Sequence, residues 1–176
     1  MKFLETSIPG AFVVEPEPLG DSRGFFARLW CAREFAELGL DTATAQISIS
    51  YNREVGTLRG MHFQASPREE TKLVRCVAGA IFDVVVDLRP DSAAYRRCFG
   101  IELWAPSHRA LYVPKGVAHG YQVLAPDTEV LYQISEFYDP QSARGVRWND
   151  PAFQIAWPLP EPILSERDAS YADFPL

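Results

Sequence analysis

Short apolar segments, broken about every ten residues by prolines and glycines, make up most of this chain, a pattern typical of a β-sandwich or β-barrel. The 14 prolines and 11 glycines punctuate these segments. Ala78 and Gly79 look like a hairpin turn between two of them. The segments predicted to be strands are residues 11–15, 45–51, 58–64, 73–77, 81–88, 111–113, 118–123 and 129–137.

Some of these segments alternate between apolar and polar residues, as strands with two different faces do. In residues 81–88, Asp83 and Asp87 lie on one face of the strand, and apolar side chains occupy the other face. In residues 45–51 the alternation sets Ala45, Ile47 and Ile49 against Gln46, Ser48 and Ser50. One helix is predicted over residues 32–38, and Gly39 is placed to end it. We therefore expect an all-β fold of antiparallel strands with a few short helices.

The length and composition indicate one globular domain over residues 1–176, large enough to bury a core. Apolar residues make up 47% and aromatic residues 12%. The formal charge of −6 and the pI near 5.1 argue against a nucleic-acid partner or an anionic membrane surface bound through bulk charge. A small anionic ligand stays compatible with this charge, because a local cluster of arginines can bind it.

The cysteines and the N-terminus indicate a cytoplasmic protein. Cys31, Cys76 and Cys98 are odd in number and widely spaced, which fits neither a disulfide framework nor a zinc site. The first ten residues, MKFLETSIPG, reach a polar break too early for a signal peptide. No apolar run approaches the length of about 18 residues that a membrane span needs.

The stretch GTLRGMHFQ, residues 56–64, places polar side chains inside a predicted strand. Strict alternation puts four of its residues on one side: Leu58, Gly60, His62 and Gln64. A histidine and an amide beside a glycine suit the wall of a polar pocket, although a buried histidine bonded to a carbonyl is an equal alternative. Arg59 lies on the other side, so a bulge near Gly60 is required if Arg59 and His62 both face one site.

Polar residues from at least five predicted strands would share the interior: Gln46, His62, Gln64, Lys72, Asp83, His119 and Tyr132. A small barrel either fills its interior or holds one ligand, and this inventory favours a ligand. The histidine can take a proton, the tyrosine can give one, and the lysine can meet a developing negative charge. Arg23 and Arg59 suit phosphate, and Asp168 could orient the histidine as the acid of a triad does. Taken one at a time, these residues also have structural explanations: Tyr132 could be a core tyrosine, and Asp83 could simply cap hydrogen bonds.

A metal-dependent barrel is the competing chemistry, and it would need about three histidines and a carboxylate. His108 looks like an exposed turn residue, and Gln64 stands where a second imidazole would be expected. Only His62, His119 and one of Glu69 or Glu70 remain, so no metal site is predicted.

Six stretches in this order resemble the dTDP-4-dehydrorhamnose 3,5-epimerase family. They are GTLRGMHFQ, ETKLVRCVAGAIFDVVVDLRP, YVPKGVAHGYQVL, EVLYQISEFYDP, RWNDPAFQIAWP and ILSERD. The resemblance implies a cupin-type jelly roll, usually a homodimer. It also implies catalysis without a metal or organic cofactor on a dTDP-linked 4-keto-6-deoxy sugar.

The resemblance assigns roles to matching positions. His62 corresponds to the general base, Asp168 to its paired carboxylate, and Tyr132 to the acid on the opposite face of the sugar. Lys72 corresponds to the lysine near the keto oxygen. The residues expected to bind substrate are Arg23, Phe26, Gln46, Ser48, Arg59, His119, Tyr138 and Arg167. Ser48 stands where an asparagine is usual, Arg167 where a lysine is usual, and Arg28 where a glutamate is expected.

Four alternatives remain open at the level of the sequence. An enzyme of this kind could invert only one carbon, or it could move the keto group as a 3,4-ketoisomerase does. A metal-dependent cupin and a non-catalytic sugar-nucleotide binding module are the other two. The proposed base, acid and cation match the chemistry of a 4-ketone, which acidifies the hydrogens on the carbons beside it.

Overall fold

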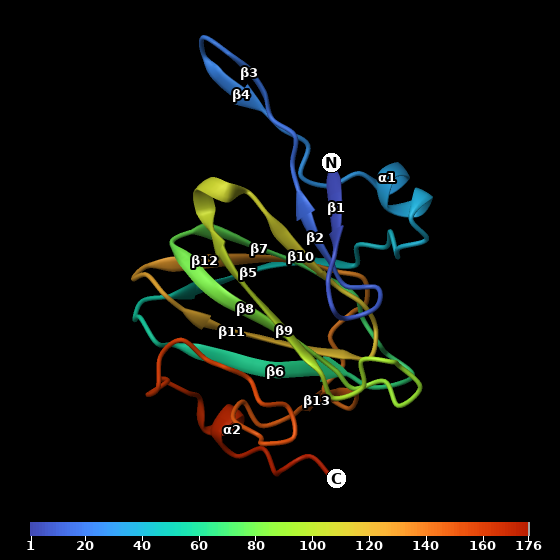
Figure 1. Cartoon of the computed structure of the whole chain (residues 1–176), viewed down its shortest axis with the longest axis vertical. Coiled ribbons are helices and arrows are strands. Elements are labelled where there is room, and N and C mark those ends of the chain that lie inside the picture. The colour runs from blue at the N-terminus through green and yellow to red at the C-terminus, as the bar shows by residue number, and fades with distance from the viewer. Residues whose placement is uncertain (176) are drawn as a thin grey trace.

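Two antiparallel sheets face each other in this computed structural model, which describes residues 1–175 (Figure 1). The larger sheet contains, in spatial order, β1 (Lys2–Glu5), β2 (Phe12–Glu15), β10 (Ala110–Val113), β7 (Lys72–Ala78), β12 (Thr128–Ile134) and β5 (Gln46–Asn52). The smaller sheet contains β13 (Ala143–Gly145), β6 (Leu58–Gln64), β11 (Val117–Val123), β8 (Ala80–Asp87) and β9 (Cys98–Trp104). From β5 onward the chain mostly alternates between the two sheets, which is a jelly-roll arrangement and confirms the predicted fold class.

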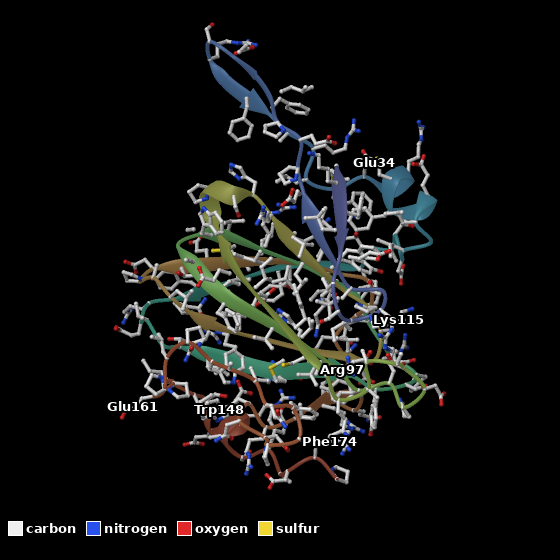
Figure 2. All side chains as sticks on the ribbon, viewed as in Figure 1. Glu34, Arg97, Lys115, Trp148, Glu161 and Phe174 are labelled. Atoms are coloured by element: carbon white, nitrogen blue, oxygen red, sulfur yellow. The ribbon has the colours of Figure 1, made fainter. Side chains whose placement is uncertain are left out.

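The inner faces of the two sheets form the main hydrophobic core. Val74 and Val130 from the larger sheet meet Val85 and Tyr121 from the smaller one, and all four are buried. Figure 2 shows side chains filling the space between the sheets. This core supports one wall of the polar cavity described below.

A second hydrophobic cluster lies behind the smaller sheet, where the C-terminal segment covers it. Val84 and Val86 of β8 contact Phe153 and Phe174 there, the latter labelled in Figure 2. Asp83 and Asp87 lie on the opposite, inward face of β8. The predicted alternation of residues 81–88 is therefore confirmed.

A two-stranded arm of β3 (Leu19–Asp21) and β4 (Gly24–Phe26) projects away from both sheets (Figure 1). Leu19, Phe25 and Phe26 are exposed on it. The helices are short: α1 (Ala32–Glu37) covers the outer face of the larger sheet through the buried Phe35, and α2 (Glu166–Ala169) lies near the C-terminus. A single 3₁₀ turn, η1 (Ala105–Ser107), precedes β10.

Several element boundaries differ from those predicted. β12 ends at Ile134 and not at residue 137, because the chain turns away there and leaves Phe137 exposed. Strand β9 was not predicted, although Phe99, Ile101 and Leu103 alternate along it and face the main core. None of the helices formed by residues 1–175 has the length and apolar character needed to cross a membrane.

Candidate active site

A cavity of about 460 Å³ opens between the two sheets. Its wall includes all of the predicted site residues except Arg23 and Phe26. Those present are Gln46, Ser48, Arg59, His62, Lys72, His119, Tyr132, Tyr138, Arg167 and Asp168. They come from both sheets and from the C-terminal segment, so the cavity exists only when these distant parts of the chain are assembled.

A break in β6 brings Arg59 and His62 to the same cavity. The pairing of β6 with β11 shifts register here, with His62 opposite His119 but Arg59 opposite Tyr121. Gly60, whose φ is +134°, sits at the shift, and a Cβ added there would lie 2.5 Å from the Cα of Gly120. The strict alternation expected for residues 58–64 is therefore wrong, and the bulge anticipated near Gly60 is present.

His62 and Asp168 form a hydrogen-bonded pair on the smaller-sheet side of the cavity. The Nε2 of His62 lies 2.6 Å from Oδ1 of Asp168, and the backbone N–H of Gly60 donates to Oδ2 over 3.3 Å. Asp168 is buried, whereas 39% of the His62 side chain is exposed. The pairing fixes the imidazole and leaves its other nitrogen, Nδ1, as a proton acceptor for a ligand.

The local structure of the C-terminal segment places Asp168. Ser165 caps α2 by accepting a hydrogen bond from the backbone N–H of Asp168 over 3.1 Å. Burial alone would raise the pKa of Asp168, but the hydrogen bond and charge of His62, with the Gly60 amide, outweigh it and lower the pKa. The carboxylate is therefore charged at neutral pH.

Tyr132 reaches the cavity from β12, on the sheet opposite His62. Burial and the nearby Tyr121 raise the pKa of the Tyr132 phenol well above its ordinary value. The phenol is therefore a proton donor at neutral pH. Its ring lies edge-on to that of His119, with 6.2 Å between centroids.

A second histidine–aspartate pair lies deeper, on the smaller sheet. The Nε2 of His119 is 2.6 Å from Oδ1 of Asp83, and both side chains are buried. Asp83 therefore stands behind His119 and not in the wall of the cavity, where it was expected with the other polar residues. The pair holds the imidazole of His119 in one orientation toward the cavity.

Lys72 is held by two contacts at the edge of the cavity. Its ammonium donates to the His62 backbone carbonyl over 3.0 Å and lies 2.9 Å from Oε1 of Glu70. The other oxygen, Oε2, is buried without a hydrogen-bond partner among residues 1–175. The sequence offers Glu70 only as a weak metal-ligand candidate, because its contact with Lys72 depends on the folding of the irregular segment before β7.

Other residues of the wall were missed or have structural contacts. Tyr121 lines the cavity, although the sequence pattern predicts no role for it. Its position two residues after His119 on β11 is the signal that places it on the same face. The side-chain amide of Gln64 donates to the backbone carbonyls of Arg68 and Phe137. The carbonyl oxygen of Gln46 accepts from the Tyr138 backbone over 2.7 Å.

Arg23 and Phe26 lie outside the cavity of their own chain. Both belong to the projecting arm of β3 and β4 (Figure 1), where Phe26 is 73% exposed and Arg23 pairs with Asp21. They do not contact the residues with which they were expected to act. Within residues 1–175, moreover, no three histidine, cysteine or acidic side chains converge as metal ligands would.

The fold and the cavity define a cupin-type jelly-roll protein with a cavity lined by titratable side chains between its sheets. A family model described as dTDP-4-dehydrorhamnose 3,5-epimerase matches residues 5–175. A protein of that name from Shigella flexneri is 38% identical over 175 residues, covering 99% of this chain and 96% of that one. The chain belongs to the dTDP-4-dehydrorhamnose 3,5-epimerase family.

Solved structures agree with this assignment. The crystal structure of a dTDP-4-dehydrorhamnose 3,5-epimerase from Bacillus anthracis, with TDP and PPi bound, has a TM-score of 0.94 and 42% identity, covering 98% of this chain and 99% of that one. ChmJ, a 3'-monoepimerase from Streptomyces bikiniensis solved with dTDP-quinovose, has a TM-score of 0.88 and 33% identity, covering 96% and 85%. Proteins similar to this chain in fold and sequence therefore include both a 3,5-epimerase and a 3'-monoepimerase.

Proposed function

We propose that this protein inverts carbons 3 and 5 of a dTDP-linked 4-keto-6-deoxyhexose. One observation carries the proposal: His62 on the smaller sheet, paired with Asp168 of α2, faces the cavity from one side, and Tyr132 on the larger sheet faces it from the other. A base and an acid on opposite sides of a ring are what inversion of a carbon by proton transfer requires.

The ketone at carbon 4 makes the neighbouring C–H bonds acidic. His62 takes the proton from one face, and the electron pair of the C–H bond moves to the keto oxygen as an enolate. Lys72 supplies a positive charge near that oxygen, which stabilises it in a cavity poor in water. Tyr132 then protonates the same carbon from the opposite face, so the centre inverts.

Cationic and polar side chains in the same wall fit the nucleotide diphosphate. The guanidinium of Arg59 faces the cavity and matches phosphate oxygens in pairs. Arg167 lies beside Tyr138 and Tyr171, whose hydroxyls raise the pKa of its guanidinium. Gln46 and Ser48 on β5 complete the polar wall that we assign to nucleotide binding.

We infer that the protein acts as a homodimer in which the arm of one subunit reaches the cavity of the other. Arg23 and Phe26 are assigned to the nucleotide, yet they project away from their own cavity (Figure 1). Ile47 and Ile49, on the outer face of the edge strand β5, are 63% and 58% exposed. A second copy would cover this apolar face and bring its own arm to the first subunit's nucleotide.

We also propose a domain organisation, a cofactor requirement and a cellular location for the protein. The chain forms one catalytic domain that needs neither a metal nor an organic cofactor, because His62, Tyr132 and Lys72 supply the base, the acid and the cation. We place the protein in the cytoplasm, with which three free cysteines are compatible.

Inversion of carbon 3 alone is the second candidate, favoured by the similarity to ChmJ. Proton NMR of the purified protein with dTDP-4-keto-6-deoxyglucose in deuterated water separates the two. Loss of both the carbon 3 and the carbon 5 signals is expected. Loss of the carbon 3 signal alone would indicate a monoepimerase, and no loss at either carbon would overturn the proposed substrate.

A further inference from the structure

A chain of hydrogen bonds runs from Tyr132 to Arg59 behind the cavity wall. The Ser50 hydroxyl lies 3.4 Å from the Tyr132 hydroxyl and 2.8 Å from that of Tyr121. The Tyr121 hydroxyl lies 3.3 Å from Oδ1 of Asn52, and Nε of Arg59 donates to the same oxygen over 2.8 Å. The catalytic hydroxyl and the phosphate-binding guanidinium are thus linked through three other side chains.

The chemistry of Asn52 sets the direction of this chain. Its carbonyl oxygen can only accept, so the hydroxyl of Tyr121 must donate to it. Tyr121 has a single hydrogen, so its oxygen accepts the hydrogen of Ser50. Ser50 then has only lone pairs left for Tyr132, which must donate to it. In this arrangement the acidic hydrogen of Tyr132 points at Ser50 and away from the cavity.

Protonation of the sugar needs the opposite arrangement at Tyr132. The phenol must direct its hydrogen toward the sugar carbon, and the phenolate that remains must accept a hydrogen bond. The Ser50 hydroxyl lies 3.4 Å from the Tyr132 oxygen, and it can donate to a phenolate there only by turning its hydrogen away from Tyr121. In the free protein the Ser50 hydroxyl lies closer to Tyr121 than to Tyr132, which favours donation from Ser50 to Tyr121.

We propose that Ser50 is a positioning residue that switches between Tyr121 and Tyr132 and thereby directs the proton of the catalytic acid into the cavity. The proposal rests on the proposed epimerase function. In the resting state Asn52 accepts a hydrogen bond from Tyr121, which in turn accepts one from Ser50. The guanidinium of Arg59 donates to the same oxygen of Asn52 as Tyr121 does. When the sugar binds, Ser50 donates to Tyr132, and Tyr132 passes its proton to carbon. Water afterwards returns a proton to the phenolate and removes one from His62, which restores both groups.

Burial is the main reason that the pKa of Tyr132 is high, and hydrogen bonding with Ser50 acts in the opposite direction. This is the effect expected of a donor that stabilises the phenolate. Ser50 therefore acts on the second half of the reaction, after His62 has already removed the proton from carbon. Removal of the proton alone is visible as exchange with solvent without inversion.

The test compares exchange with inversion in Ser50→Ala, using proton NMR of the full-length protein with dTDP-4-keto-6-deoxyglucose in deuterated water. We expect deuterium exchange within about threefold of wild type and inversion slowed about 10–100-fold, in the lower range of a general-acid contribution. Ser50→Thr, which keeps the hydroxyl, should restore most of the inversion. Tyr121→Phe should slow inversion less than Ser50→Ala, because it frees Ser50 to donate to Tyr132.

The results for these variants distinguish a switching role of Ser50 from a merely structural one. Exchange and inversion that fall together in Ser50→Ala would indicate a merely structural role and overturn the proposal, as would unchanged inversion. A Tyr121→Phe variant that inverts more slowly than Ser50→Ala would also overturn the switch. Wild-type protein without any exchange would instead refute the epimerase function itself, which separates the two failures.

Discussion

His62, the proposed base, and Arg59, the proposed phosphate-binding residue, stand three residues apart on β6, yet their substitutions should have opposite effects. His62→Ala removes the proton acceptor, so exchange of ring protons should fall about 10²–10⁴-fold while dTDP affinity stays nearly intact. Arg59→Ala should weaken dTDP binding first, because it removes a charge-assisted contact to the diphosphate. Isothermal titration with dTDP and NMR exchange measure the two effects. Full turnover by both variants would refute the site assignment.

Asp168 also makes the stability of the fold depend on pH. Burial would raise its pKa, but His62 and the Gly60 amide lower it below the ordinary 3.8. A carboxylate whose pKa is lowered on folding adds stability that is complete above its unfolded pKa and is lost as the pH falls through the folded value.

We therefore expect Asp168→Asn to lower the free energy of unfolding by an amount that shrinks as the pH falls below about 5. Urea denaturation of both proteins at several pH values between neutrality and the acid range measures this difference. A difference that stays unchanged through the acid range would contradict the assigned ionisation of Asp168.

At the scale of elements, the close approach of β6 and β11 decides the shape of the site. A Cβ at position 60 would lie 2.5 Å from the Cα of Gly120. The backbone φ of Gly60 is +134°, which residues with a side chain rarely adopt. Gly60→Ala should therefore lower the free energy of unfolding by at least about 2 kcal/mol and move Arg59 or His62 out of the cavity.

Gly24→Ala is the matched control for this prediction. Its φ of +132° is nearly the same, but a Cβ there would meet nothing within 4 Å. Thermal denaturation of both variants separates backbone strain from the clash between strands. Equal losses of stability would show that the contact between β6 and β11 contributes nothing.

At the scale of the whole molecule, the position of the arm predicts that each complete site needs two chains. Mixed dimers of Arg23→Ala and His62→Ala test this directly. In a mixed dimer the intact cavity of the Arg23→Ala subunit would receive the intact arm of its partner. If the subunits reassort at random, about a quarter of wild-type activity should return on mixing, although each variant alone is impaired. An absence of recovery in mixed dimers isolated with two affinity tags would contradict the exchange of arms.

The sequence by itself determined the fold class and most of the chemical groups in the site. Alternation along a strand is a local property, so it identified the inward polar face of β5 and the two faces of β8 without any structure. The residue types of His62, Tyr132 and Lys72 indicated proton transfer for the same reason, since a side chain carries its chemistry wherever the fold puts it.

Only the tertiary structure decided how these groups meet. The bulge at Gly60 depends on the facing backbone of Gly120, and no pattern within β6 specifies it. Asp168 contacts His62 across 106 positions of the chain. The placement of Asp83 behind His119 and of the arm outside its own cavity likewise depends on contacts between distant segments. A linear sequence constrains periodicity and chemistry strongly, but it leaves such long-range distances to the packing of the folded chain.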